Sequence, residues 1–174
     1  MFCKVFPKKQ GESMKKYMAS FLFCTLNLMS ECSFSSNALI AKKGEVTDTK
    51  TGLIWSRCSL GQVWHKSKGC VGDVALLRRN EAEERVRSLG TKWRLPSIDE
   101  LLTLVEPRCK SPMINAKFFG KVYNFTGEGA IYLSSSIYLE GDEVMPTLFY
   151  TIDLMNGGVD AHTKSFVGAV RLVR

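Results

Sequence analysis

The clearest pattern of apolar and polar positions lies between residues 93 and 105. Residues 93–95 (Trp-Arg-Leu) alternate apolar and charged side chains, which predicts a short strand. Pro96 ends this strand because proline has no N–H to donate to a β-ladder. Ser97 and Glu100 have the spacing of a capping box, so a helix is expected to begin directly after the corner. The apolar residues that follow recur at helical spacing: Ile98, Leu101, Leu102 and Val105.

The segment before this corner predicts strands, a loop and a helix, in that order. Residues 46–48 and 53–57 are rich in β-favouring side chains and flank a turn at 49–52. Residues 58–72 contain three glycines and are expected to form a loop, and residues 73–77 lead towards a helix that ends at Gly90. Asn80 and Glu83 have capping spacing, and the apolar stripe of this helix is Ala82, Val86 and Leu89.

The segment after the corner is expected to contain mainly loops and antiparallel strands. Residues 107–112 and 120–129 are irregular, and residues 114–119, with Asn115 among apolar neighbours, are expected to pack as a loop. A polar excursion is expected at 139–146, and Asn156-Gly157 is a strong hairpin signal. The expected strands are 131–136, 147–154 (the longest), a return strand from Val159, and 169–174. Segregated helices beside antiparallel strands predict an α+β domain.

The first 38 residues are typical of an export signal. Lys15 and Lys16 precede a short apolar run from Met18 to Met29, and residues 36–38 (Ser-Asn-Ala) are small at the positions that a signal peptidase reads. The run is too short to span a bilayer, which takes about 20 residues. We therefore expect cleavage after Ala38 and a protein that is periplasmic, at the cell surface or secreted. Met14 is the expected true start, so residues 1–13 are a spurious extension.

Three cysteines remain after such a cleavage: Cys58, Cys70 and Cys109. In an oxidising compartment they allow one disulfide in three ways, of which Cys58–Cys70 closes the shortest loop and is the expected one. Cys109 would then be free, buried or paired between chains. The spacing does not resemble a zinc site, because no Cys-x-x-Cys occurs and only His65 and His162 are available, so no metal and no cofactor are expected.

The net charge of the chain does not indicate a nucleic-acid partner. The chain carries 24 Lys and Arg against 17 Asp and Glu, a net charge of +7. Residues 1–38 hold five lysines and two glutamates, so the rest of the chain carries +4. No basic run alternates with aromatic side chains as in nucleic-acid-binding modules, and no nucleic-acid partner is expected.

Several motifs resemble a known family. They are Thr51-Gly52-Leu53-Ile54-Trp55, Arg57-Cys58-Ser59 with Gly61-Gln62 and Trp64, Trp93-Arg94-Leu95-Pro96 with Glu100-Leu101, Ile114-Asn115 with Phe118, the serines 134–136, and Val170-Arg171-Leu172-Val173-Arg174. In this order the motifs are similar to those of the Lcl C-terminal domain family, a domain of unknown function, over about residues 46–174. Residues 39–45 are then a short linker.

The resemblance implies a C-type-lectin-like fold, with two helices, a small antiparallel sheet closed by the N- and C-terminal strands, and long loops. Family members are typically exported by bacteria, and some are adhesive domains that bind glycans, including sulfated polysaccharides. The chain departs from the family at Tyr132-Leu133, where an aromatic-Trp pair is common. It also lacks the Glu-Pro-Asn, Gln-Pro-Asp and Trp-Asn-Asp signatures of calcium-dependent lectins, so a calcium-bridged sugar site is not expected.

Two groups of residues follow from these patterns. The corner and core residues are expected to be structural, with Arg94 paired to a carboxylate: Trp55, Trp93, Arg94, Pro96, Ser97 and Glu100. The candidate ligand-binding residues are Trp64, His65, Lys66, Tyr138, Asp142, His162 and Lys164. Trp64 could stack on a sugar or pack against the loop between Cys58 and Cys70. Four basic residues could also cluster: Lys117, Lys121, Lys164 and Arg171.

The function expected from the sequence is therefore a non-catalytic binding module, with a glycan or a cell-surface protein as its partner. The serine run lacks the Gly-x-Ser-x-Gly elbow of a nucleophile, and no catalytic set is assigned. A structural or accessory subunit of a surface fibre is the main alternative. An enzyme related to the sulfatase-activating oxidases is the remaining one, but those enzymes use paired C-terminal cysteines and no cysteine follows Cys109 here.

Overall fold

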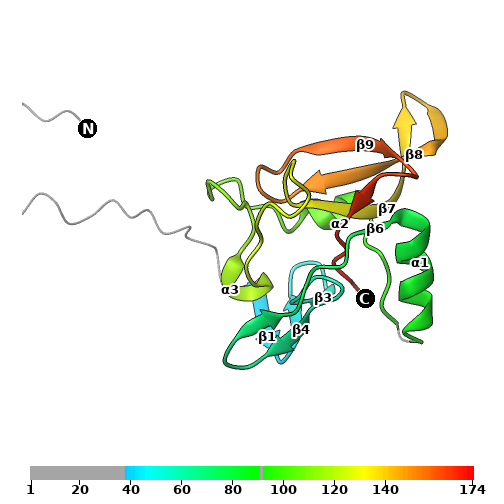
Figure 1. Cartoon of the computed structure of the whole chain (residues 1–174). Coiled ribbons are helices and arrows are strands. Elements are labelled where there is room, and N and C mark those ends of the chain that lie inside the picture. Colours follow the sequence, from blue (N-terminus) through cyan, green and yellow to red (C-terminus); the bar gives the residue numbers. More distant parts are fainter. Residues whose placement is uncertain (1–37, 91) are drawn as a thin grey trace, which may run out of the picture. The chain divides into compact units, whose positions relative to one another are not determined.

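A computed structural model of the chain describes residues 38–90 and 92–174 (Figure 1). The predictions for the signal segment, for Met14 and for the cysteines before residue 38 lie outside the described residues. The described part is a mixture of short helices and small antiparallel sheets, which confirms the α+β class.

The first sheet contains β1 (Leu39–Lys42), β2 (Glu45–Asp48) and β3 (Ile54–Ser56), in that order. The expected linker at 39–45 is therefore wrong, because residues 39–42 pair along their length with β2. The turn after β2 is held by Asp48, whose carboxylate accepts hydrogen bonds from the Lys50 N–H (2.9 Å) and the Thr51 hydroxyl (3.0 Å).

The C-terminal segment closes this sheet. The N–H groups of Ile54 and Arg174 each donate to the other residue's carbonyl oxygen at 2.9 Å. On the other side, Val173 exchanges a reciprocal pair of backbone hydrogen bonds with Arg94. These contacts bring the strand near Leu53 beside the end of the chain, as predicted. The segment forms isolated bridges at Ala169 and Val173 rather than a continuous strand, and residues 93–95 likewise contribute only a bridge at Arg94.

The second sheet contains β7 (Ile131–Glu140), β8 (Glu143–Asp153) and β9 (Val159–Thr163). The expected polar excursion at 139–146 is wrong, because β7 and β8 continue as a hairpin to the pair Glu140–Glu143. Gly141 permits the tight connection, with φ of 62°. The Asn156-Gly157 turn and the return strand from Val159 are confirmed, although only Gly157 of the two turn residues has positive φ.

Four short strands form two further pairs. β4 (Val63–His65) pairs with β5 (Gly69–Val71), and β6 (Leu77–Arg78) pairs with β10 (Val167–Gly168). The expected loop at 58–72 is therefore a hairpin over most of its length. The alternation of apolar and polar side chains is a weak signal there because each strand has only three residues.

The described residues contain three helices, not two. They are α1 (Arg79–Ser88), α2 (Ile98–Leu102) and α3 (Ala116–Phe119). The capping box is confirmed in α2: the Ser97 hydroxyl accepts from the Glu100 N–H (3.1 Å), and the Glu100 carboxylate accepts from the Ser97 N–H (2.8 Å). α3 replaces the expected packed loop at 114–119, with Asn115 as its N-cap.

The cap predicted for α1 is wrong by two residues. Arg78 is the N-cap, and the carboxylate of Glu81 accepts from both its N–H and its guanidinium at 2.9 Å. Ala82 and Val86 are buried as expected, but Leu89 is the C-cap and is 39% exposed. The stripe shortens because the helix ends one residue earlier than its pattern suggested.

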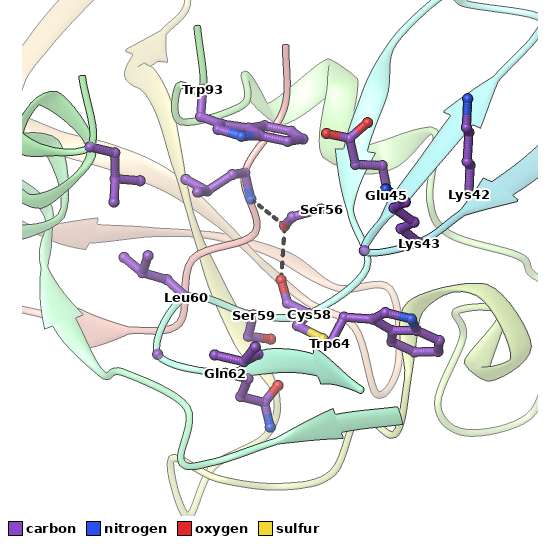
Figure 2. Close-up of a pocket in the computed structure, with 15 residues that line it drawn as sticks. Lys42, Lys43, Glu45, Ser56, Cys58, Ser59, Leu60, Gln62, Trp64 and Trp93 are labelled. Atoms are coloured by element: carbon purple, nitrogen blue, oxygen red, sulfur yellow. Dashed lines mark hydrogen bonds between the residues drawn. The ribbon is translucent and has the colours of Figure 1, made fainter. Parts of the chain in front are cut away.

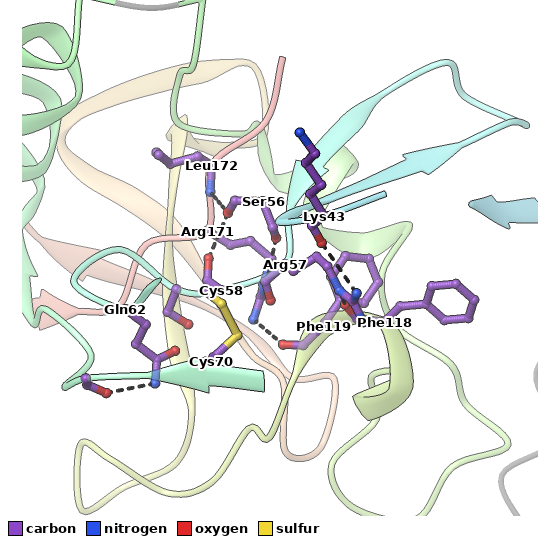
Figure 3. Close-up of a disulfide and its surroundings, with 12 residues drawn as sticks. Lys43, Ser56, Arg57, Cys58, Gln62, Cys70, Phe118, Phe119, Arg171 and Leu172 are labelled. Carbon is purple, nitrogen blue, oxygen red and sulfur yellow. Dashed lines mark hydrogen bonds between the residues drawn. A yellow bond between two sulfur atoms is a disulfide. The ribbon is translucent and has the colours of Figure 1, made fainter. Parts of the chain in front are cut away.

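Two apolar clusters form the core. One joins α2 and α3 to the first sheet, and the other joins α1 to the β7–β8 pair; their largest buried side chains are Trp55, Leu101, Phe119, Tyr132, Leu133 and Phe149. The disulfide Cys58–Cys70 links the end of β3 to β5 (Figure 3). Cys109 is buried and is also disulfide-bonded; the alternatives given for it apply to a chain cleaved after Ala38 and stay predictions.

Candidate functional site

A groove with a volume of about 660 Å³ lies between the β1–β2 turn and strand β4 (Figure 2). Figure 2 shows the side chains of Trp93 and Trp64 at two sides of this groove, with Leu60 between them on a third side. The polar side chains of its lining are Lys42, Lys43, Glu45, Ser56, Ser59 and Gln62. We call it the two-tryptophan groove.

Trp64 is held in place by an arginine. The guanidinium of Arg57 lies 3.5 Å from the centroid of the Trp64 ring, a cation–π contact. Arg57 is itself fixed, because its Nε donates to the carbonyl oxygen of Phe118 and its Nη2 to that of Lys117, both at 2.8 Å. Partial burial lowers the pKa of the Arg57 guanidinium, but an arginine remains charged at neutral pH. The indole therefore has one restrained orientation.

The disulfide fixes the hairpin that carries Trp64. Cys70 is the residue opposite Trp64 in the β4–β5 register, so the bond to Cys58 ties this hairpin to the chain beside Arg57. Gly120 leaves room for it: a Cβ there would lie 2.9 Å from the Cys70 sulfur, and the φ of 71° also favours glycine. A hairpin with three-residue strands has only marginal stability by itself, so the disulfide is needed to fix this wall of the groove.

A buried arginine holds the backbone of Ser56, which lines the groove. Arg171 is 1% exposed, and its guanidinium donates to the carbonyl oxygens of Ser56 (3.0 Å), Arg57 (2.6 Å) and Phe119 (3.3 Å) and to the Tyr132 hydroxyl (3.3 Å). All of these partners are neutral. Because it is buried, Arg171 cannot belong to an exposed basic cluster with Lys117, Lys121 and Lys164, and that prediction is wrong. Its side chain instead joins β3, α3 and β7.

The exposed charges at the groove are mainly positive. Lys42 and Lys43 are exposed at the β1–β2 turn. The one carboxylate of the lining, Glu45, is paired with the guanidinium of Arg174 at 2.9 Å, and Arg174 lies over the Trp93 ring at 4.9 Å. The two lysines therefore leave a net positive rim beside two indoles.

The structure does not bring the seven predicted ligand-binding residues together. Trp64 lines the groove, whereas His65 and Lys66 are exposed at the end of the same hairpin, outside its lining. The other four belong to the second sheet and its turns, and none of them lines the groove: Tyr138, Asp142, His162 and Lys164. Tyr138 packs against Tyr150, with ring centroids 5.1 Å apart.

The His162 side chain contacts two residues close to it in sequence, Phe166 and Asp160. Its ring stacks on Phe166 at 3.7 Å between centroids, and its Nε2 lies 3.8 Å from a carboxylate oxygen of Asp160. Asp142 and Lys164 are exposed. These residues therefore form a surface separate from the two-tryptophan groove.

The residues predicted to be structural form the corner before α2. Arg94 donates two hydrogen bonds to the Glu100 carboxylate, at 2.7 and 2.6 Å, and this pairing lowers the pKa of Glu100 from its ordinary value. The carbonyl oxygen of Pro96 accepts from the Ser135 N–H of β7 at 2.7 Å. Trp55 is fully buried. Trp93 is different, because it is partly exposed and lines the groove as well as packing on the core.

Sequence reasoning missed Lys42, Lys43 and Glu45, because residues 39–45 were assigned to a linker. The available signal was Lys43-Gly44 between two short β-favouring runs, which is typical of a hairpin turn. Lys43 indeed has a φ of 53° there.

Two further features are absent from the described residues. Within residues 38–90 and 92–174, no group of three or more His, Cys, Asp and Glu side chains is close enough to hold a metal ion. No helix in the described part is both long and apolar enough to cross a bilayer.

A family model described as the Lcl C-terminal domain matches residues 44–174. No curated protein and no solved structure matches the chain.

Proposed function

The chain belongs to the Lcl C-terminal domain family, and we propose that it is an exported, non-catalytic binding module that holds an anionic polysaccharide in the two-tryptophan groove. The observation that carries this proposal is the combination of two indoles with Lys42 and Lys43 at one groove. Indole faces stack on the apolar faces of sugar rings, and exposed lysines attract sulfate or carboxylate groups.

The fixed orientation of the groove supports a binding role. Arg57 and the Cys58–Cys70 disulfide hold Trp64, and Arg174 packs on Trp93, so neither wall must become ordered when a ligand binds. A preorganised surface avoids the entropic cost of ordering side chains on binding.

We propose a C-type-lectin-like scaffold for this module. The features that favour it are the closure of the β1–β2–β3 sheet by the C-terminal segment, the two longer helices α1 and α2, and the separate β7–β8–β9 sheet. Such a scaffold places ligand sites on loops and turns; Lys43 lies in the β1–β2 turn and Lys42 directly before it.

The binding test uses the full chain and heparin as the anionic probe. We expect heparin binding measured by titration calorimetry to weaken about tenfold for Trp64→Ala and again for Lys42→Ala/Lys43→Ala, since a lost stacking or charge contact of about 1.4 kcal/mol is tenfold in affinity. Binding should also weaken as salt is raised, because exposed charges are screened.

The controls match each variant with a similar side chain elsewhere. Tyr138→Ala removes an aromatic ring, and Lys121→Ala/Lys164→Ala removes two lysines, in both cases outside the groove lining. These variants should bind as the unaltered chain does. Absence of binding to heparin and to an array of other acidic and neutral glycans, or equal losses in the control variants, would refute the proposed site.

Export is part of the proposal and has its own test. N-terminal sequencing of the secreted protein should show a start at residue 39. A mature start before residue 30 would contradict cleavage after Ala38.

A structural subunit is the second candidate, favoured by a different surface. Leu139 and Val144 form a cross-strand pair near the tip of the β7–β8 hairpin and are 49% and 58% exposed. Paired exposed apolar side chains favour association with another surface. Concentration-dependent sedimentation that is lost in Leu139→Ser would support assembly through this hairpin, and a monomer at every concentration would exclude it.

A further inference from the structure

A second groove also has Trp93 in its lining. It has a volume of about 520 Å³ and is lined by residues of α1, of the corner before α2 and of β7: Glu83, Val86, Arg87, Trp93, Arg94, Leu95 and Ser135. Trp93 lines both this groove and the two-tryptophan groove. Leu89, the C-cap of α1, also borders the two-tryptophan groove, so the end of α1 lies along both. We call the second one the α1 groove.

A third groove, also of about 520 Å³, adjoins the two-tryptophan groove at a different place. The two share Leu60 and Gly61, and the third groove continues along another side of α1, past Glu84 and Arg85. A ligand longer than the two-tryptophan groove can therefore continue over Trp93 or over Leu60.

Charge distinguishes these routes. In the α1 groove, Glu83 is paired with Arg79 at 3.0 Å and Arg94 with Glu100 at 2.6 Å, which leaves the positive charge of exposed Arg87. In the third groove, Glu81 is paired with Arg78 at 2.9 Å, and the charges of Glu84 and Arg85 cancel.

The side chains at the two crossings also differ. The route over Trp93 offers an indole on which a sugar ring can stack, whereas the route over Leu60 and Gly61 offers an aliphatic side chain and backbone. Arg174 lies over the Trp93 ring and is held by Glu45, so the indole at the crossing is restrained. An anionic sugar polymer therefore makes more favourable stacking and charge contacts along the route over Trp93 than along the route over Leu60.

We propose that the ligand is an extended anionic polysaccharide that runs from Lys42 and Lys43 across Trp93 into the α1 groove, where Arg87 binds an acidic group. This inference rests on the function proposed above and adds to it a second subsite, a direction and a minimum chain length. Trp93 is the shared contact between the subsites. Arg87 acts only on chains long enough to cross it.

The test uses size-defined heparin oligosaccharides and titration calorimetry with the full chain. Affinity should rise with oligosaccharide length until both grooves are filled and then remain constant. Arg87→Ala should weaken binding of the long oligosaccharides about threefold and leave that of the shortest binding one unchanged, because a single exposed charge contact is weak. Arg85→Ala is the matched control, since it removes the same charge from the same helix at the third groove.

Each outcome decides between the two proposals. If short and long oligosaccharides bind equally well, the second subsite is excluded and the binding function stands. If Arg85→Ala weakens long-chain binding and Arg87→Ala does not, the route over Trp93 is wrong. If no oligosaccharide binds at any length, the proposed function fails and this inference fails with it. Both arginines are exposed, so these variants are expected to fold normally.

Discussion

The β4–β5 and β7–β8 hairpins are stabilised in different ways. The β4–β5 hairpin has three-residue strands, and a disulfide and the Arg57–Trp64 contact attach it to the rest of the fold. The β7–β8 hairpin has strands of 10 and 11 residues, and its base is buried in the core at Leu133 and Ile152.

This difference explains which hairpin leaves an aromatic side chain at a groove. The β7–β8 hairpin buries the apolar side chains at its base in the core, and Tyr138 near its tip packs against Tyr150 of the same hairpin. The short hairpin contributes little to the core and keeps Trp64 partly exposed at a groove. Cross-linking replaces burial as its source of rigidity, and the following substitutions test this contrast.

The largest effect is expected at the base of the long hairpin. Ile152→Ala removes a fully buried side chain of β8 and should reduce the free energy of unfolding by about 4 kcal/mol, because it loses apolar contacts and leaves a cavity. Urea denaturation measures this. A loss below about 1 kcal/mol would contradict the view that burial holds β7–β8 in place.

The next effect is expected at the disulfide. Cys58→Ser/Cys70→Ser should lower the free energy of unfolding by about 3 kcal/mol, because the disulfide no longer restricts the unfolded chain. Amide hydrogen exchange should become faster in residues 63–71, whereas exchange in β8 should change only as much as the global stability does. The affinity for heparin should fall by as much as it does in Trp64→Ala. Unchanged exchange at 63–71 would show that Arg57 alone holds the hairpin.

A smaller, pH-dependent effect is expected at the corner that joins α2 to β7. Here the Ser136 hydroxyl accepts from the Ile98 N–H at 3.0 Å, so the start of α2 is attached to the long hairpin. Arg94 lowers the pKa of Glu100 below the ordinary 4.5. A lowered carboxyl pKa stabilises the folded state above pH 4.5, and this contribution is lost as the pH falls below that value towards the folded pKa.

Glu100→Gln tests this contribution. The variant should be less stable than the unaltered chain by about 1 kcal/mol at pH 7, as expected for a half-exposed ion pair, and the difference should shrink as the pH is lowered from 6 to 3. Thermal unfolding across that range measures it. A difference that is constant with pH would mean that Glu100 acts only through its contacts and not through its charge.

The smallest effect is expected at the tip of the long hairpin. Leu139→Ser and Val144→Ser alter exposed side chains and should change the free energy of unfolding by no more than about 0.5 kcal/mol. Heparin binding should not change, because neither residue lines the grooves. A loss of binding in either variant would move the ligand surface to the second sheet.

The sequence alone determined the features that depend on neighbours in the chain. The capping box at Ser97 and Glu100, the turn after Asp48, the stop at Gly90 and the α+β class all follow from local hydrogen bonding, backbone geometry and side-chain periodicity. Family motifs also identified the domain from a single chain. The predicted strand boundaries are wrong where pairing with another strand decides them, as at residues 39–42 and 139–146.

Only the tertiary structure decided where the candidate site lies. Arg171 has the alternation of an exposed strand residue, yet its guanidinium is buried because carbonyl groups of Ser56, Arg57 and Phe119 converge on it. Trp93 and Trp64 are 29 positions apart in sequence and become two walls of one groove because the C-terminal segment inserts between β3 and the corner at Arg94. Such convergence depends on contacts between distant segments, and no local pattern encodes it.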